Sequence, residues 1–563
     1  MWDACGFFPA KGIEMLSLLS LIKIDEAGML TMHDQLRDLG REIVCQENPK
    51  EPLKRSRLWN KEEAVDVLDN KGTRKLEALY LDNNGRRRRY TNEQFKELTN
   101  LRFLQLDGAN FMGDFQNLLP QLRWLQWWNC PSDFIATNFQ PKKLVVLDLS
   151  NSAITEDWGG WGLLKIATEL KVLDFTSCQS LRRIPELSNL KSLEILILKY
   201  CGDLEEIHPS IGDINTLVTL DVNGCLKLEE LPAGVGRMKE LRELLLASTD
   251  IQEIPISRGC LMKLETLRAS NCKELAQLPE SVGSLVSLTQ LDLSYSAIEK
   301  LPESMGSLVS LTQLDLSHSA IKKLPESMGS LVSLTQLDLL HSAIEKLPES
   351  MGSLVSLTRL NLSHSAIGKL PESMGSLVSL TQLNVSHSAI GKLPESIGSL
   401  VSLTQLNVSH SAIEKLPESM GSLVSLTRLY LSHSAIEKLP ESVGSLVSLT
   451  QLNLSHSAIE KLPESMGSLV SLTRLNLSNS AIEKLPESMG SLVSLTQLDL
   501  SRSRIEKLPE SMGSLVSLTR LDLSCSRIEK LPESMGSLVS LTQLNVSHSP
   551  IKKLPESIGS LVS

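Results

Sequence analysis

The chain has 563 residues, of which 41% are hydrophobic, 22% charged and 4% aromatic, and its formal net charge is -10. This composition is too apolar for a disordered chain, and the length is too great for one compact core. The negative balance argues against a broad surface for nucleic acid or an anionic membrane, because both require clustered positive charge. No stretch approaches the ~18 apolar residues of a membrane span. We therefore expect a soluble cytoplasmic protein with no nucleic-acid or membrane partner.

Residues 1–60 show local signals for a small winged-helix-like α+β unit. The pattern predicts, in order, a short apolar helix, a strand, a turn and a second strand at residues 12–19, 21–24, 25–28 and 29–32. A longer helix then begins with Asp34 as the expected N-cap, and its apolar face carries Leu36, Leu39, Ile43 and Val44. Residues 61–75 follow as a predicted linker.

A repeat dominates the rest of the chain. Leu-Pro pairs recur with a period of 23 residues from Pro279 to Pro555, and near-identical units fill residues 288–563, the last one incomplete. Each unit matches LxxLxLxxSxI, which is the leucine-rich-repeat signature. The same template occurs with looser text in residues 76–287, which brings the total to about 21 repeats. Its expected strands begin near Leu76, Leu101, Leu122, Leu144, Leu170, Leu193, Leu217, Leu241 and Leu264.

The repeat predicts an α/β solenoid. Leu291 and Leu293 alternate with polar residues, as in a short strand with one buried face, and residues 301–308 provide a turn and about one helical turn. One unit cannot bury its own leucines, so the units must stack into a horseshoe with a parallel sheet on its concave side.

The segment before the repeats resembles a known family. Met32-His33-Asp34, the helix after it and Lys54-Arg-Ser-Arg-Leu-Trp59 look like the junction between the nucleotide-binding (NB-ARC) domain and the repeats of plant NLR disease-resistance proteins. Trp2-Asp-Ala-Cys-Gly-Phe-Phe-Pro9 is similar to the subclass that carries a TIR domain (TIR-NBS-LRR). In such proteins the histidine of the MHD motif contacts the β-phosphate of ADP and helps to hold the resting state. The resemblance assigns this role to His33, between Met32 and Asp34.

The chain also departs from that family. It contains no GxxxxGK[ST] phosphate loop, so His33 lacks the pocket that would give it a ligand. We expect no cofactor for this chain, and ADP or ATP only in a full-length receptor. No TIR domain precedes Trp2, and the repeats stop in mid-unit at Ser563. The expectation is therefore the C-terminal portion of a receptor, or a truncated gene product.

These features predict a fragment of an intracellular immune receptor. Its repeats would bind a pathogen effector, or other receptor domains in an autoinhibited state. The alternative is a stand-alone scaffold similar to Ras-group-type plant repeat proteins, which the Leu-Pro-Glu-Ser-x-Gly text favours. We predict no catalytic activity and no metal site, because the many Ser, His and Asp residues are repeated surface positions. The sequence leaves the oligomeric state open.

Partner recognition is expected where the repeated surface columns break, because the tract after Leu288 is nearly uniform. The candidate residues form an aromatic stretch and a late cluster: Trp124, Trp127 and Trp128, and Tyr430, Arg502, Arg520 and Arg527. Core packing is the expected fate of at least one tryptophan. Arg86 to Arg89 suggest a solvated loop, with nuclear localisation as the alternative.

Histidine and cysteine each recur at one position of several repeats, and each recurrence has a structural and a functional interpretation. Histidine fills the eighth position of seven successive repeats, at His318, His341, His364, His387, His410, His433 and His456. Duplication explains them, and a pH-responsive or metal-binding ladder is the alternative. The nine cysteines lack CxxC spacing, which predicts reduced thiols. Five occupy the ninth position of an early repeat, where a small buried side chain is expected and a redox role is the alternative: Cys130, Cys178, Cys201, Cys225 and Cys272.

Overall fold

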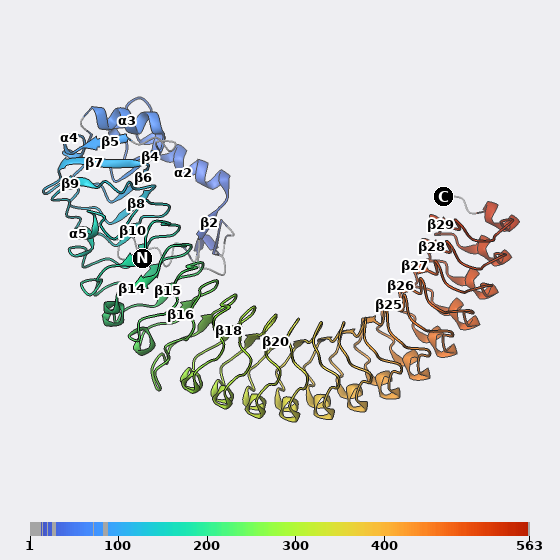
Figure 1. Cartoon of the computed structure of the whole chain (residues 1–563). Coiled ribbons are helices and arrows are strands. Elements are labelled where there is room, and N and C mark those ends of the chain that lie inside the picture. The colour runs from blue at the N-terminus through green and yellow to red at the C-terminus, as the bar shows by residue number, and fades with distance from the viewer. Residues whose placement is uncertain are drawn as a thin grey trace. The chain divides into compact units, whose positions relative to one another are not determined.

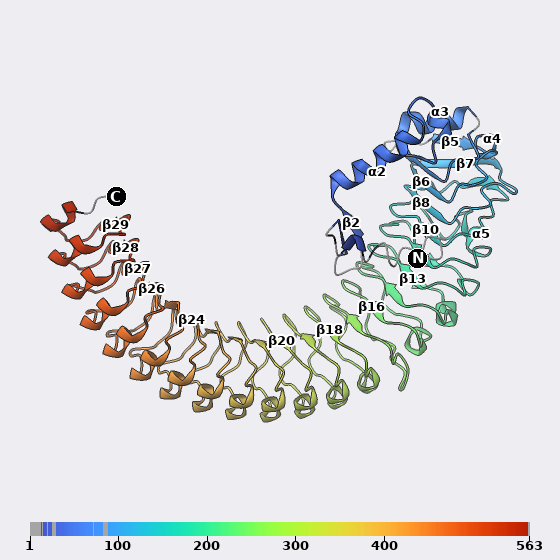
Figure 2. The same ribbon diagram turned by 180° about the vertical axis from the view of Figure 1, so that it is seen from behind.

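The computed structural model describes residues 13, 15–17, 19, 21–24, 30–70, 72–82 and 88–560. The chain divides into two compact units, Met1–Glu274 and Leu275–Ser563, and each is described by itself (Figures 1 and 2). The predicted turn at 25–28, the segment Trp2 to Pro9 and residues Arg86 and Arg87 lie outside the described residues.

The first unit opens with the predicted hairpin. Strands β1 (Ile22–Ile24) and β2 (Leu30–Met32) pair antiparallel, and helix α2 (Asp34–Glu47) follows. The prediction of Asp34 as the N-cap is wrong, because the imidazole Nδ1 of His33 accepts the backbone N–H of Gln35 and makes His33 the cap. On the apolar face of α2, Val44 is buried whereas Leu39 and Ile43 are 56% and 58% exposed.

The segment expected to be a linker, residues 61–75, contains helix α3 (Lys61–Asp69). Asn60 caps this helix, since its Oδ1 accepts the backbone N–H groups of Glu62 and Glu63. Its inner face is fully apolar and packs on the first strands of the repeats, with Ala64, Val67 and Leu68 buried. The segment is therefore a packed cap on the repeat stack.

A parallel sheet runs through the first unit. Each repeat strand begins two residues after the leucine that marks it in the sequence, which confirms the repeat assignment. The strands are β3 (Arg57–Leu58), β4 (Ala78–Asp82), β6 (Phe103–Asp107), β8 (Trp124–Trp128), β10 (Val146–Asp148), β11 (Val172–Asp174), β13 (Ile195–Ile197), β15 (Thr219–Asp221), β16 (Glu243–Leu245) and β17 (Thr266–Arg268).

Smaller elements lie away from this sheet. Two short parallel sheets join β5 (Arg88–Thr91), β7 (Ala109–Asp114) and β9 (Ile135–Thr137), and β12 (Arg183–Ile184) and β14 (Glu206–Ile207). The short helical segments are η1 (Pro52–Lys54), α4 (Asn92–Phe95), α5 (Trp161–Leu164), η2 (Pro209–Asp213) and η3 (Val235–Arg237).

Aromatic rings fill the core of the first repeats. The Phe111 ring lies 5.2 Å from that of Phe95, 4.9 Å from that of Phe115 and 4.7 Å from that of Trp127. All four side chains are fully buried. This packing explains why the aromatic residues are concentrated in the early part of the sequence.

The second unit is a stack of nearly identical coils. Leu291 and Leu293 are buried, as the alternation predicts, and the strands lie on one side of the coils with the helical turns on the other (Figure 1). The strands are β18 (Gln290–Asp292), β19 (Gln313–Asp315), β20 (Gln336–Asp338), β21 (Arg359–Asn361), β22 (Gln382–Asn384), β23 (Gln405–Asn407), β24 (Arg428–Tyr430), β25 (Gln451–Asn453), β26 (Arg474–Asn476), β27 (Gln497–Asp499), β28 (Arg520–Asp522) and β29 (Gln543–Asn545).

Each helical turn of this unit is a 3-10 turn that packs closely on the next. The turns run from η4 (Glu280–Ser284) to η16 (Glu556–Ser560) and have the same sequence pattern, with glycine in the fourth position. A Cβ atom on Gly375 would lie 2.7 Å from both the carbonyl oxygen and the Cβ of Ser396 in the following coil. Glycine is therefore required by the spacing of the coils at this edge.

Candidate protein-binding surfaces

The MHD-like residues lie between the hairpin and α2. Met32 ends β2, and Asp34 starts α2, where its carboxylate pairs with the Arg37 guanidinium at 3.0 Å. Because His33 Nδ1 accepts a hydrogen bond, its proton resides on Nε2, the nitrogen left free for a further partner. The three residues are exposed in this chain.

An apolar column crosses the sheet face of the first unit. Strand register places Phe103, Trp124, Val146, Val172 and Ile195 side by side on successive strands. Val146 and Val172 are buried, whereas Phe103, Trp124 and Ile195 remain partly exposed and pack against them. We call these five residues the apolar column. Sequence reasoning missed all but Trp124, although each lies two positions after the first leucine of its repeat.

A pocket of about 350 Å³ opens at the start of the apolar column. Phe103 and Trp124 line it, together with Trp59 and Tyr80 from the neighbouring coils. Its lining therefore includes four aromatic side chains, which suit an apolar side chain of a partner.

Only two of the three tryptophans of the predicted binding site are accessible at the surface. The assignment of Trp127 to a binding surface is wrong, because its ring is fully buried and its Nε1–H donates to the Ala109 carbonyl at 2.8 Å. Trp128 is half-buried on the sheet face, where its Nε1–H donates to Asp148 Oδ2 at 2.9 Å. Trp124 and Trp128 are therefore the two that a partner can reach.

An acidic row lies beside the apolar column. Asp148 and Asp174 are in register on β10 and β11, and Asp221 has the same register on β15, beyond Ile197 of β13. Burial raises the pKa of Asp174, and the carboxylates of Asp148 and Asp221 raise it further, although the Thr176 hydroxyl and N–H donate to it. Burial also raises the pKa of Asp221.

The predicted late cluster is not one site. Tyr430 lies on β24, where its hydroxyl donates to Gln451 Oε1 at 3.3 Å, and Arg520 lies on β28, four strands away. Arg502 follows β27 in the left-handed region with φ of 54°, and Arg527 follows β28. The three arginines are exposed, but Tyr430 is too distant to join them.

The histidine column forms a stacked ladder. From His318 to His456, successive imidazole rings lie 4.0 to 4.6 Å apart with interplanar angles of 9° to 23°. The Tyr295 ring stacks on His318 at 4.1 Å, and Asn479 meets Nδ1 of His456 at the other end. Every histidine of the ladder has φ of 53° to 55°.

The ladder has no metal-binding geometry within the described residues, where no group of three or more His, Cys, Asp or Glu side chains could hold an ion. Desolvation lowers the pKa of His364, His410 and His433, and the neighbouring imidazoles lower it further.

The cysteine column is structural. The Sγ atoms of Cys178, Cys201 and Cys225 lie 3.1 to 3.2 Å from backbone carbonyls of the preceding coil and donate to them. Serines occupy the same turn in the second unit, where Ser296 Oγ donates to the Leu293 carbonyl at 2.6 Å. Burial raises the pKa of the Cys130 and Cys225 thiols, so these groups stay protonated.

Two charged features complete the first unit. Arg88 and Arg89 lie on β5 and pair with Asp69 at 3.2 Å and Asp133 at 3.7 Å, so they are not part of a free loop.

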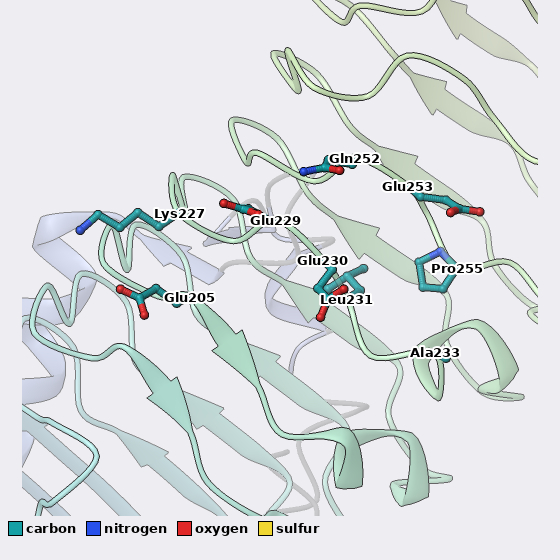
Figure 3. A pocket seen from close by; sticks show the side chains of 9 residues that line it. All are labelled: Glu205, Lys227, Glu229, Glu230, Leu231, Ala233, Gln252, Glu253 and Pro255. Carbon is teal, nitrogen blue, oxygen red and sulfur yellow. The ribbon is translucent and has the colours of Figure 1, made fainter.

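A pocket of about 690 Å³ is lined by Glu205, Lys227, Glu229, Glu230, Leu231, Ala233, Gln252, Glu253 and Pro255 (Figure 3).

Family models match both parts of the chain. The leucine-rich repeat region model matches residues 303–390 and 373–453, and the leucine rich repeat model matches residues 447–505 and 493–551. The winged-helix domain model of Roq1-like disease resistance proteins matches residues 1–48. No helix in the described ranges is long and apolar enough to cross a membrane.

Solved structures support the solenoid fold. A leucine-rich-repeat protein of Leptospira interrogans aligns with a TM-score of 0.55 and 27% identity, covering 70% of this chain and 93% of that one. A TDR receptor aligns with a TM-score of 0.59 and 24% identity, covering 87% of each chain.

Curated relatives are plant resistance proteins. TMV resistance protein N of Nicotiana glutinosa is 30% identical over 41% of this chain and 20% of its own length. Disease resistance protein RPV1 of Vitis rotundifolia is 40% identical over 38% of this chain and 17% of its own length. The chain thus matches about a fifth of each relative. The winged-helix match beside the repeats and these relatives together support the resemblance of this chain to plant NLR disease-resistance proteins.

Proposed function

We propose that the chain is the recognition part of an intracellular plant immune receptor, with the repeats binding a pathogen effector directly. The observation that carries this proposal is the partly exposed apolar column of the first unit with its aromatic pocket of about 350 Å³. Aromatic side chains in a concave, partly desolvated site are the usual anchors of protein interfaces. The acidic row beside it would select the orientation of the partner by charge.

The upstream part of the receptor would supply nucleotide chemistry. By family resemblance, His33 would contact the ADP phosphate through Nε2 once an NB-ARC domain with a phosphate loop is present. A TIR domain would carry the downstream signal. In this arrangement the repeats recognise the partner and also hold the resting state, and the chain itself performs no catalysis.

A two-hybrid screen of defined pathogen effectors against the whole chain tests this proposal. Ile195→Asp places a charge in the apolar column, whereas the matched control Val309→Asp changes a side chain that is 50% exposed outside that column. We expect effectors whose binding is lost with Ile195→Asp and retained with Val309→Asp. Binders that respond equally to the two changes would contradict the assignment of the surface.

A further inference from the structure

The outward columns of the second unit change charge along the sheet. The change occurs in two columns of side chains. The first column holds the residue before the middle leucine of each strand, and the second column holds the residue after it. Strands β18 to β20 carry Asp in the second column, and so do β27 and β28, whereas β21 to β26 carry Asn361, Asn384, Asn407, Tyr430, Asn453 and Asn476. Between Asp338 and Asp499 the sheet face therefore presents no carboxylate.

Three of the same six strands carry a cation. Arg359, Arg428 and Arg474 replace the glutamine of the first column, on β21, β24 and β26. All three are exposed, and none of the ion pairs in the described part of the chain involves them. We call the sheet face of β21 to β26, with the imidazoles beside it, the cationic window.

The imidazoles add a charge that depends on pH. His364, His387, His410, His433 and His456 border the window, and their rings stack at 4.0 to 4.1 Å. Desolvation lowers the pKa of His364, His410 and His433, and the repulsion between neighbouring imidazolium ions lowers it further. A bound anion would offset this repulsion and allow the rings to take up protons.

Other charged residues lie on the coils around the histidine ladder. Asp338 lies on the strand before the window, and Asp499 and Arg502 lie on the coil beyond it. On the coils of the window, Glu414, Glu437, Glu460 and Glu483 are each followed by a lysine, in a segment outside the sheet. The charged groups that act on His364, His410 and His433 are other imidazoles of the ladder.

We propose that the cationic window binds an extended acidic segment of a protein partner, and that it does so with proton uptake. The inference rests on the proposed function only in taking the repeats as a protein-binding surface. Arg359 and Arg428 are three strands apart and Arg474 is two strands further, which corresponds to about 14 and 10 Å at the usual strand spacing. An extended peptide spans these gaps with about four and three residues, so carboxylates every third or fourth residue match the arginines.

The neutral side chains of the window favour a peptide over a nucleic acid. The remaining Gln residues present amide donors and acceptors that suit peptide groups. The Asn column adds mainly N–H donors, because the Oδ1 atom of each Asn accepts the N–H of the serine two residues later. Three arginines spread over five strand spacings give a low charge density, and the whole chain has a net charge of -10. A nucleic acid would need closely clustered cations to offset its phosphates.

Fluorescence anisotropy with the whole chain tests the proposal. The probe is a labelled peptide of about 12 residues with Glu at every third position, and its Glu→Gln counterpart is the neutral control. The combined change Arg359→Gln, Arg428→Gln and Arg474→Gln should weaken binding about tenfold at pH 7.5. Lys415→Gln, Lys438→Gln and Lys461→Gln remove the same charge outside the sheet and should change it less than about twofold. Replacing the three arginines by lysine should restore most of the affinity, which separates charge from folding.

The pH dependence is the second readout. From pH 7.5 to 5.5 the affinity of the whole chain should rise, and His387→Asn, His410→Asn and His433→Asn together should remove most of that rise. Equal losses in the arginine and lysine sets would overturn the proposal, because they would show a net-charge effect only. An affinity that does not change with pH, or stronger binding of single-stranded oligonucleotide than of the acidic peptide, would also overturn it. Loss of effector binding with Ile195→Asp concerns the first unit alone, so the two proposals can fail separately.

Discussion

Gly375→Ala tests the spacing of the coils in the second unit. The new Cβ would lie 2.7 Å from the Cβ and carbonyl oxygen of Ser396, whereas carbon atoms pack best at about 3.5–4.0 Å. The next coil must therefore move by about 0.8 Å, and no rotamer change can relieve a contact with backbone. Overpacking of this kind costs about 1–3 kcal/mol. The matched control is Gly368→Ala in the same coil, where nothing lies within 4 Å of the new Cβ.

Hydrogen exchange with mass spectrometry measures this effect locally, which suits a stack that need not unfold in one step. Peptides that contain Gly391 and Ile397 differ in mass from those of the other coils and report on the coil that receives the contact. With Gly375→Ala their protection should fall about 5- to 150-fold, which corresponds to the same 1–3 kcal/mol. With Gly368→Ala it should stay constant or rise slightly, because alanine restricts the unfolded chain. Equal protection in the two variants would refute the close-packing argument.

Three further predictions concern thiols, imidazoles and nucleotide. In the native protein a thiol reagent should label the exposed Cys525 quickly and the buried Cys201 only after denaturation, and fast labelling of Cys201 in the native state would contradict its structural role. The lowered pKa values of His364, His410 and His433 mean that the unfolded chain binds more protons, so the stability of the second unit should be full above about pH 6.5 and fall as the pH drops through the folded values. Urea unfolding at several pH values, with His410→Asn as control, measures this stability, and a stability that rises on acidification would refute the reasoning. Calorimetry should detect no ADP binding with a dissociation constant below about 10 μM, because the phosphate loop is missing, and tighter binding would show that another cradle exists.

Most of the repeat architecture could be predicted because apolar residues recur at the same places of each repeat, and these places are the buried ones. From Leu79 to Leu523, the apolar residues at the fourth and sixth places of the repeats are buried, and the first leucine of each repeat located its strand in the main sheet to within two residues. The helix at Lys61–Asp69 was missed although its signals are local: Asn60 is a good N-cap, and Ala64, Val67 and Leu68 lie at helical spacing.

The left-handed backbone at the eighth repeat position was harder to predict. Histidine is not a typical residue for this region, but five earlier coils carry glycine or asparagine there, with φ of 51° to 76°: Gly108, Asn129, Asn151, Gly224 and Asn271. These residue types favour the left-handed region. The apolar column was missed for a different reason. Its members, such as Phe103 and Ile195, are distant in sequence and become one surface only through strand register. The fate of each tryptophan follows from the same alternation, which directs Trp127 inward and its neighbour outward.

The near-identity of the coils in the second unit has a consequence for how the chain folds. A coil that pairs one period out of place buries the same leucines against the same partners, so side-chain fit hardly distinguishes the correct neighbour from the next one. Such a mismatch leaves a loop of one repeat, and lengthening a loop adds little entropy cost. The interlocked rings around Phe111 have no duplicate in the described sequence, and therefore offer a unique nucleus in the first unit. We expect ordered growth from that nucleus, with each finished coil serving as the template that sets the position of the one after it.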